Sequence, residues 1–430
     1  IQGWMILILG WVFVPFYTRS MVYTMPEFLE RRYNPQSRTI LSVISLVSYV
    51  LTKVAVTVYA GGLVFQQVFG IKELWGIDFF WIAAIGLVVL TALYTIFGGM
   101  KSVLYTSVLQ TPILLLGSLI ILVLGFKELG GWDEMMRVCG AVTVNDYGDT
   151  MTNLIRSNDD ANFPWLGALI GSAIIGFWYW CTDQFIVQRV LSGKNEMEAR
   201  RGTIFGAYLK LLPVFLFLIP GMIAFALHQK YIGAGGEGFL PMLANGTANA
   251  DAAFPTLVAK LLPAGVKGLV VCGILAALMS SLASLFNSSA MLFTIDFYKR
   301  FKPETPEKKL VGIGQIATIV IVVLGILWIP IMRSVGDVLY TYLQDVQSVL
   351  APGIAAAFLL GICWKRTSAQ GGMWGLISGM VIGLTRLGAK VYYSNAGEVA
   401  DSTFKYLFYD MNWLFFCGWM FLFCIIVVIV

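Results

Sequence analysis

Eleven long apolar stretches follow one another along this chain, and they limit what it can fold into. Each is long enough to cross the hydrocarbon core of a bilayer, which takes about 20 helical residues. They lie near residues 2–18, 39–69, 78–98, 103–126, 164–188, 203–228, 266–297, 310–332, 336–363, 371–393 and 410–430. Backbone N–H and C=O groups find no water in lipid and must bond within the segment. The sequence therefore predicts an all-α membrane protein with about 11 transmembrane helices.

The composition agrees with a membrane protein and argues against several functions. Hydrophobic residues make up 58% of the chain and charged residues 12%, whereas about a quarter of a soluble domain is charged. The single histidine, His228, and six cysteines without metal-ligand spacing predict no histidine or cysteine metal cluster. No histidines or paired carboxylates converge in the apolar stretches, so we do not expect an enzyme. The net charge of +5 gives no reason to expect a nucleic-acid partner.

The loops between the stretches carry unequal positive charge. Alternate loops hold 16 of the 29 Lys and Arg residues, and the remaining loops hold nine. The positive-inside rule makes the richer set cytoplasmic, which places the long loops 127–163 and 229–265 outside the cell. Segment 19–38 is expected to form a short amphipathic helix on the inner face. We therefore expect a multi-pass protein of the cell membrane. Because the chain begins and ends inside apolar stretches, we expect it to be a fragment of a longer protein.

The segment Gly273–Tyr298 carries a row of small residues on one helical face. Ala277, Ser280 and Ser281 are spaced i, i+3 and i+4, and further serines follow at one-turn intervals. On its own, such a row more often marks a seam where another helix packs closely. Serine hydroxyls and a freed helix carbonyl would equally suit a hard cation, which prefers oxygen ligands.

The tenth stretch repeats glycine at every fourth position. The glycines are Gly371, Gly375, Gly379 and Gly383. This GxxxG spacing predicts close helix packing.

Several polar side chains lie deep in the apolar stretches, where they are costly. Lys210 comes one turn before Pro213, Lys53 lies near the middle of the second stretch, and Gln344 lies in the ninth. Amide and ammonium groups could donate to the hydroxyls of a sugar, and an aromatic face could cover its ring. Lys210 could instead extend to the lipid headgroups. The aromatic run Phe177–Trp180 in the fifth stretch could bind a ring or simply pack.

Taken together, these segments resemble the sodium/solute symporter family and, within it, the sodium/glucose cotransporters. The resemblance is carried by TMPEFLERRY, WYWCTDQFIVQR, GAYLKLLPVFLFLIPGM, ALMSSLASLFNSSAMLFTIDFY and APGIAAAFLLGICWKR, which occur in the family's order. It implies a single transporter domain, 1–430, with the inverted-repeat fold of the leucine-transporter type. The family has fourteen helices, and the resemblance implies that the first core helix and the last accessory helix are among those missing here.

The resemblance also implies a role for individual residues. The implied sodium ligands are Ala277, Ser280 and Ser281. The implied substrate-site residues are Gln344, Lys210, Tyr179, Trp180, Lys53 and Tyr340. Among these, Tyr179 would be a gate beneath the sugar and Tyr340 an outer gate.

Two positions depart from the family's pattern. Ser107 stands in the motif YTSVLQT where many members have aspartate, which weakens the case for a second cation site there. Gly176 replaces a polar residue that contacts substrate in some members, which leaves the identity of the sugar open.

The resemblance implies a symporter that couples Na⁺ entry to the uptake of a glucose- or galactose-like sugar by alternating access. Its expected partners are the sugar, the sodium ion and the lipid bilayer. Another solute of the same superfamily (inositol, a carboxylate or sialic acid) is the nearer alternative, although a reader of anions would be expected to show an intramembrane arginine. A channel or membrane sensor is the more distant alternative.

Overall fold

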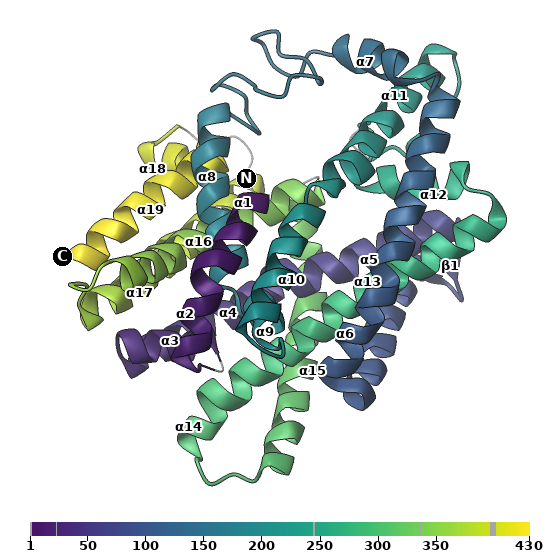
Figure 1. The fold of residues 1–430 in the computed structure, drawn as a ribbon. Helices are drawn as coiled ribbons and strands as arrows, with labels where there is room; N and C mark the ends of the chain where they lie inside the picture. Colours follow the sequence, from purple (N-terminus) through teal and green to yellow (C-terminus); the bar gives the residue numbers. More distant parts are fainter. Residues whose placement is uncertain (1, 23, 244–245, 336–337, 396–400) are drawn as a thin grey trace. The chain divides into compact units, whose positions relative to one another are not determined.

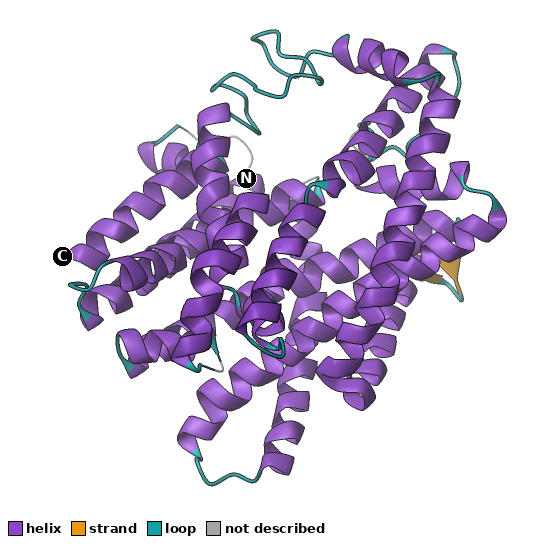
Figure 2. Cartoon of the chain, in the orientation of Figure 1, coloured by secondary structure: helices purple, strands orange, loops and turns teal. Residues whose placement is uncertain are grey.

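The computed structural model describes residues 2–430 except for 23, 244–245, 336–337 and 396–400. Helices dominate (Figure 2), and the named strands, β1 (Glu73–Leu74) and β2 (Ile77–Asp78), form one antiparallel hairpin. Trp75 and Gly76 connect the two strands with φ angles of 55° and 75°, the backbone that a two-residue hairpin turn requires. The predicted all-α class is confirmed.

The chain divides into two compact units, each built from separate segments of sequence. The larger unit consists of residues 1–55, 158–210 and 285–430, and the smaller unit of residues 56–157 and 211–284. The expected single transporter domain stays a prediction.

The larger unit is a bundle of helices interrupted by wider, π-helical turns. Its α-helices are α1 (Gln2–Ile8), α2 (Val14–Ser20), α3 (Met25–Arg32), α4 (Pro35–Ser48), α8 (Trp165–Phe177), α9 (Gln184–Leu191), α10 (Glu196–Leu209), α14 (Lys299–Phe301), α15 (Glu307–Val335), α16 (Leu339–Cys363), α17 (Ala369–Asn395), α18 (Thr403–Lys405) and α19 (Trp413–Ile429). Its π-helical turns are η1 (Leu9–Phe13), η2 (Tyr49–Val54), η3 (Trp178–Thr182), η6 (Leu292–Tyr298) and η7 (Tyr406–Asp410). Such turns often accompany functional sites in membrane and soluble helices.

Helix α16 is the most buried of the long apolar helices described here, and it packs against α8, α17 and α19. In Figure 1, α16, α17 and α19 lie side by side, coloured green to yellow. Glycines allow this approach: a Cβ on Gly379 would lie 2.7 Å from the Gly353 Cα, and one on Gly383 would lie 2.3 Å from the Val349 carbonyl oxygen. The predicted role of the glycine repeat in helix packing is confirmed.

The smaller unit has its own apolar core. Its elements are α5 (Ala55–Phe69), β1, β2, α6 (Phe79–Leu129), α7 (Trp132–Gly140), η4 (Val214–Leu218), α11 (Ile219–Gly233), η5 (Ala250–Ala252), α12 (Ala253–Leu261) and the first part of α13 (Ala264–Met291). Ile121 of α6, Ile223 of α11 and Val270 of α13 lie in its core. A Cβ on Gly117 would lie 2.4 Å from the Val270 side chain, so this glycine permits α6 and α13 to pack.

Each of the eleven predicted stretches coincides with helix in the structure. Among the described residues, seven helices are long and apolar enough to span a membrane, and two bent pairs raise the number to nine. The pairs are Gln2–Ser20 with Met25–Arg32 and Thr403–Asp410 with Trp413–Ile429. The third and fourth stretches form one continuous helix, α6. The helical prediction is thus confirmed, while the number of eleven spans is not established.

The structure adds detail to the segments expected outside the spans. The predicted short helix in segment 19–38 is α3, which Thr24 caps by accepting a hydrogen bond from the Glu27 N–H. The segments expected as long loops contain helices α7 and α12. Helix α7 is stabilised by acidic residues in its first turn and Arg137 in its last, which complement the helix dipole.

Candidate functional site

The fifth apolar stretch breaks where its aromatic run ends. Helix α8 widens into the π-helical turn η3, and Asp183 then adopts an extended backbone (φ −78°, ψ 125°) before α9 begins. The Asp183 carboxylate accepts a 3.0 Å hydrogen bond from the Phe185 N–H and so caps α9. Inside a membrane, such a break survives only where protein or a cavity supplies partners for the freed backbone groups.

Lys53 is one of the partners that hold this break. Its side chain is 9% exposed, and its ammonium pairs with the Asp183 carboxylate. The Tyr49 hydroxyl donates to the same carboxylate at 3.0 Å. Aromatic rings surround the ammonium, with centroids at 4.3 Å for Phe185, 4.6 Å for Tyr49 and 5.1 Å for Tyr179. The structure therefore places Lys53 beside Tyr179, with its charge engaged by Asp183.

A cavity of about 370 Å³ opens beside the break, within the larger unit. Its polar lining residues are Trp180, Arg189, Glu198, Thr203 and Lys210. Lys210 ends α10 and is exposed, with its Nζ atom 5.3 Å from the centroid of a Trp180 ring. The volume lies in the range of cavities that bind small molecules. Two of the predicted substrate-site residues, Trp180 and Lys210, thus share one cavity, and Tyr179 adjoins it in the chain.

Gln2 joins this group and was not predicted from the sequence. The Trp180 indole N–H donates to its Oε1 atom. Gln2 lies beside Gly176, where an added Cβ would be 3.3 Å from Gln2 Oε1 and 3.0 Å from Met5 Cγ. The signal that could have found it is the one that singled out Gln344, an amide inside an apolar stretch.

Gln344 and Tyr340 form a second group on α16. The Gln344 amide donates to the Tyr340 hydroxyl at 2.8 Å. Tyr340 is 54% exposed, and its ring centroid lies 6.4 Å from that of Phe163. No hydrogen bond or ring contact joins this pair to Trp180 or Lys210 within the described part of the chain.

A buried charge cluster joins α16 to α17, and it was not predicted from the sequence. Arg386 of α17 has no exposed surface; its guanidinium donates to the Met411 carbonyl at 2.6 Å and lies 3.7 Å from the Asp345 carboxylate. Lys390 pairs with the same carboxylate at 2.5 Å, and the Arg386 guanidinium stacks on Phe416 at 4.1 Å. The tenth apolar stretch therefore does contain a buried arginine, but its charge is compensated within the protein.

The predicted sodium residues lie on α13, within the smaller unit. The Ser280 hydroxyl lies 2.6 Å from the Ser107 hydroxyl, and Ser280 is 6% exposed. Ala277 is half-buried, and Ser281 is exposed. Three hydroxyl oxygens are thus offered by this part of the unit, from residues of the type that a sodium ion binds. Ser284, one turn further along the row, is fully buried.

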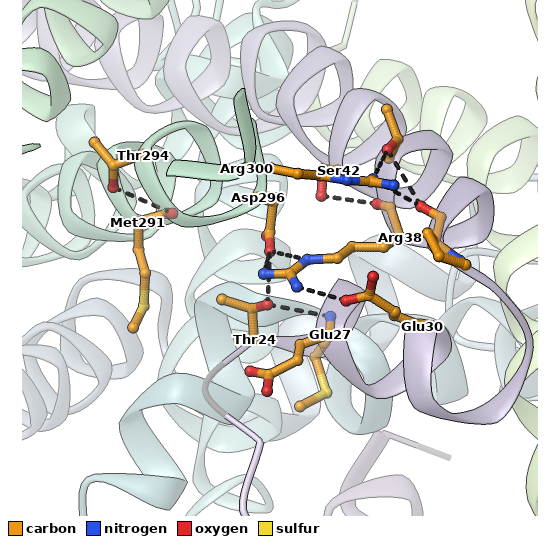
Figure 3. A network of polar contacts seen from close by, with 12 residues as sticks. Thr24, Glu27, Glu30, Arg38, Ser42, Met291, Thr294, Asp296 and Arg300 are labelled. Atoms are coloured by element: carbon orange, nitrogen blue, oxygen red, sulfur yellow. Dashed lines mark hydrogen bonds and ion pairs between the residues drawn. The ribbon is translucent and has the colours of Figure 1, made fainter. Parts of the chain in front are cut away.

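Figure 3 shows a polar network at the other end of this helical span, where α13 continues into η6. Arg38 of α4 donates to one oxygen of the buried Asp296 carboxylate at 2.7 Å and 2.6 Å. The Thr24 hydroxyl donates to the same oxygen at 3.1 Å, and Glu30 pairs with Arg38 at 2.6 Å. Thr24 therefore caps α3 and fastens it to η6 at the same time.

The opposite end of α3 is fastened to α16. Arg32 donates to the Gly361 carbonyl at 2.5 Å and to the Trp364 carbonyl at 2.9 Å. These carbonyls belong to the C-terminal end of α16, where a cation is favourable. Helix α3 thus connects the η6 end of one apolar helix with the C-terminal end of the helix that carries Gln344.

Comparison with known proteins places the chain among transporters. A family model described as the sodium:solute symporter family matches residues 1–379. The chain is 37% identical to sodium/myo-inositol cotransporter 2 of Homo sapiens, over 89% of this chain and 57% of that protein. It is 39% identical to the sodium/mannose cotransporter SLC5A10 of Bos taurus (89% and 65%) and 37% identical to sodium/glucose cotransporter 1 of Ovis aries (99% and 66%). The chain therefore spans 57–66% of the length of these relatives.

A solved structure shares the fold. It is a Na⁺-coupled sialic acid symporter in a substrate-bound outward-open state, with a TM-score of 0.71, 21% sequence identity, and coverage of 99% of this chain and 81% of that one. At this identity the similarity establishes the fold alone, and it confirms the leucine-transporter type. With its apolar helices, the chain is a multi-pass membrane protein.

Proposed function

Because the chain belongs to the sodium:solute symporter family, we propose that it forms the greater part of a symporter that takes up a neutral sugar or polyol with sodium. Transport would proceed by alternating access across the cell membrane. One sodium ion moving down a potential of 100 mV supplies about 2.3 kcal/mol, in addition to its concentration gradient, to drive the solute. No chemical bond in the solute needs to change.

The observation that carries the proposal is the cavity at the break of the fifth apolar stretch. Trp180 and Lys210 line it, and Tyr179 is held next to it by the ammonium of Lys53. An aromatic face, an ammonium donor and an amide are the groups that bind a hydroxylated ring. Broken helices of this kind supply binding sites in secondary transporters.

The substrate is proposed as neutral because the most buried cations of the larger unit, among the residues that the structure describes, are already paired within the protein. Arg386, the arginine with no exposed surface, is compensated by Asp345 and a backbone carbonyl. Lys53 is likewise engaged by Asp183. The relatives named for myo-inositol, mannose and glucose all take uncharged, polyhydroxylated solutes. Sialic acid and other carboxylates are therefore the less favoured substrates.

Sodium is proposed to bind at Ala277, Ser280 and Ser281. Ser280 is buried and already oriented by Ser107, whereas Ser281 is exposed and able to turn toward an ion. Ser107 supplies a neutral oxygen where many family members have a carboxylate, which supports one sodium site in this part of the smaller unit over two.

The test is uptake by the full-length protein reconstituted in liposomes. Radiolabelled glucose, mannose, myo-inositol and sialic acid are supplied outside, with an inward gradient of sodium or of potassium. We expect saturable uptake of at least one neutral solute that requires sodium and exceeds its equilibrium level. Equal uptake in potassium would indicate a channel or uniporter, and concentrative uptake of sialic acid alone would overturn the neutral substrate.

Substitutions test the proposed sugar contacts. Gln344→Ala and Lys210→Ala should each raise the KM for the sugar by about 5- to 150-fold, because each removes a hydrogen-bond donor proposed to pair with a sugar hydroxyl. Tyr179→Phe should retain more affinity than Tyr179→Ala, since the aromatic face is kept. A normal KM in both Gln344→Ala and Lys210→Ala would exclude this site while leaving sodium-coupled transport intact.

A further inference from the structure

The smaller unit contains a second cavity, which none of the residues proposed for sugar or sodium lines. Its volume is about 430 Å³, within the range of cavities that bind small molecules. Its lining residues come from the end of α5, from the segment that follows α11, and from α12. All of them belong to the same compact unit. The ligand of this cavity therefore need not be the transported solute.

The segment after α11 forms one wall of the cavity, and two helices hold it in place. The Leu240 N–H donates to His228 Nδ1 of α11 at 3.0 Å, and the Lys260 ammonium of α12 donates to the Phe239 carbonyl at 2.8 Å. The same ammonium lies 4.7 Å from the centroid of the Phe239 ring. Gly238 packs on the imidazole, since a Cβ at this position would be 2.2 Å from His228 Cε1. The cavity is therefore preformed by contacts within the protein.

Two opposite charges line the cavity without neutralising each other. Glu237 and Lys260 are exposed, and they form an ion pair neither with each other nor with any other residue in the described ranges. The Phe239 carbonyl takes one N–H of the Lys260 ammonium, so two donors remain. A bound anion would face the carboxylate, and a bound cation would face the ammonium. A ligand that carries both charges complements both groups at once.

The other lining residues supply uncharged polar groups and an apolar surface. Thr256 is 4% exposed, and its hydroxyl has no hydrogen-bond partner among the described residues. A buried hydroxyl without a partner is uncommon, and water or a ligand usually supplies one. Gln67 is half-buried and offers both an amide donor and an acceptor. Because Leu240, Pro241 and Met242 are apolar, the ligand should carry an apolar part as well.

We propose that this cavity binds a small zwitterion with an apolar side chain, of the chemical class of an α-amino acid such as leucine. The ligand's carboxylate pairs with Lys260, and its ammonium pairs with Glu237. Gln67 and Thr256 supply further hydrogen bonds, and the apolar side chain lies against the wall that contains Leu240. The inference goes beyond the proposed transport of sugar and does not depend on it.

The experiment measures binding of radiolabelled L-leucine to the full-length protein in lipid nanodiscs. We expect saturable binding that is equal in sodium and in potassium, and that glucose, mannose and myo-inositol do not displace. Isocaproate has the same carbon skeleton without the ammonium, and isoamylamine has it without the carboxylate. Each should compete about two- to fivefold less well than unlabelled leucine, because each lacks one of the two charge contacts.

Substitutions test where the ligand binds. Glu237→Gln and Lys260→Met should each weaken leucine binding by about two- to fivefold, the range for an exposed ion pair. Lys260→Arg keeps the charge and should bind leucine more tightly than Lys260→Met. Glu237→Lys should bind isocaproate better than leucine, a reversal that a merely structural role of Glu237 would not produce. The matched controls are Lys127→Met and Glu128→Gln, two exposed residues of α6 that do not line the cavity, and they should leave binding unchanged.

The contrary results are equally specific. Absence of saturable leucine binding, or equal binding of isocaproate and leucine, overturns the zwitterion site. Leucine that glucose displaces occupies the transport site, and leucine that binds normally to both Glu237→Gln and Lys260→Met occupies some other place. Either result overturns the proposal for this cavity. Sodium-driven uptake of sugar is a separate measurement, so its presence or absence neither rescues nor refutes the leucine site.

Discussion

At the scale of single residues, the larger unit pairs its most buried charges with opposite ones. Lys53 faces Asp183, and Lys390 faces Asp345. Removing water from a charge is expensive, and a partner at hydrogen-bond distance offsets much of that cost. These paired charges therefore position helices. The contacts proposed for the sugar are made by neutral amides, aromatic faces and Lys210 at the end of α10.

The Lys53–Asp183 pair gives a stability prediction at this scale. Lys53→Met leaves the Asp183 carboxylate buried with Tyr49 as its remaining side-chain donor, so the protein should lose about 3–5 kcal/mol of stability. Asp183→Asn should cost a similar amount because the ammonium is then unpaired. The double variant Lys53→Met/Asp183→Asn should lose less than the two single losses combined. Unfolding in detergent followed by tryptophan fluorescence measures this, and strictly additive losses would show that the two residues do not interact.

At the scale of elements, the packing of α16 and α17 depends on small residues. At Gly383 and Gly379 a Cβ would approach backbone atoms of α16, which cannot rotate away as a flexible side chain can. Helix α17 also carries Arg386, so the two helices are joined by both close backbone contact and charge.

This contact predicts that alanine is tolerated at one glycine of α17 and not at another. Gly383→Ala should destabilise the protein by about 1–3 kcal/mol, because its Cβ would lie 2.3 Å from the Val349 carbonyl oxygen. Gly388→Ala is the matched control on α17, where an added Cβ meets no atom within 4 Å. It should be neutral or slightly stabilising, since alanine favours helix. Thermal unfolding of both variants is the measurement, and equal melting temperatures would refute the contact.

The segment after α7 offers a pH prediction. The Ser157 backbone N–H and the Asn145 amide both donate to the Asp149 carboxylate at 2.7 Å and lower the pKa of Asp149 from 3.8 to about 2. A depressed pKa favours the folded segment above about pH 4, and this contribution is lost as the pH falls toward 2. Amide exchange at Ser157, corrected for its intrinsic rate, should therefore accelerate between pH 4 and pH 2. Asp149→Asn should exchange faster already at neutral pH, and a wild-type protein equally protected at pH 4 and pH 2 would contradict this.

At the scale of the whole molecule, the residues proposed for sodium and those proposed for sugar belong to different compact units. Cotransport requires that occupancy of one site change the affinity of the other, and this coupling is reciprocal. Sodium should therefore lower the dissociation constant for sugar by the same factor by which sugar lowers that for sodium.

The proposed coupling predicts separable variants. The double variant Ser280→Ala/Ser281→Ala should raise the sodium concentration for half-maximal uptake, while the KM for sugar measured at saturating sodium stays close to normal. Gln344→Ala should do the reverse. Ser284→Ala, on the buried next turn of α13, is the control and should leave the sodium dependence unchanged. Unaltered sodium dependence in the Ser280/Ser281 variant would assign these serines to helix packing.

The helices and the family could both be predicted from the amino-acid sequence. Long apolar stretches must be helical in lipid, because each residue's backbone groups have to bond within their own segment, and that requirement is local. Close packing at the glycine repeat of α17 could also be predicted, because small residues at one-turn spacing form one face of a helix whichever element packs against it. The order of motifs such as WYWCTDQFIVQR sufficed to identify the family.

Which polar residues contact one another could not be predicted from the sequence and became clear from the packing of the helices. Lys53 and Asp183 are far apart in sequence, as are Gln2 and Trp180, and no periodicity shows which faces of two helices will adjoin. Arg386 was overlooked for the same reason, because its carboxylate partner and its carbonyl partner come from α16 and from the segment after η7. Whether a buried charge binds a substrate or only another helix depends on which group lies within about 3–4 Å of it, and the packing of the helices sets that distance.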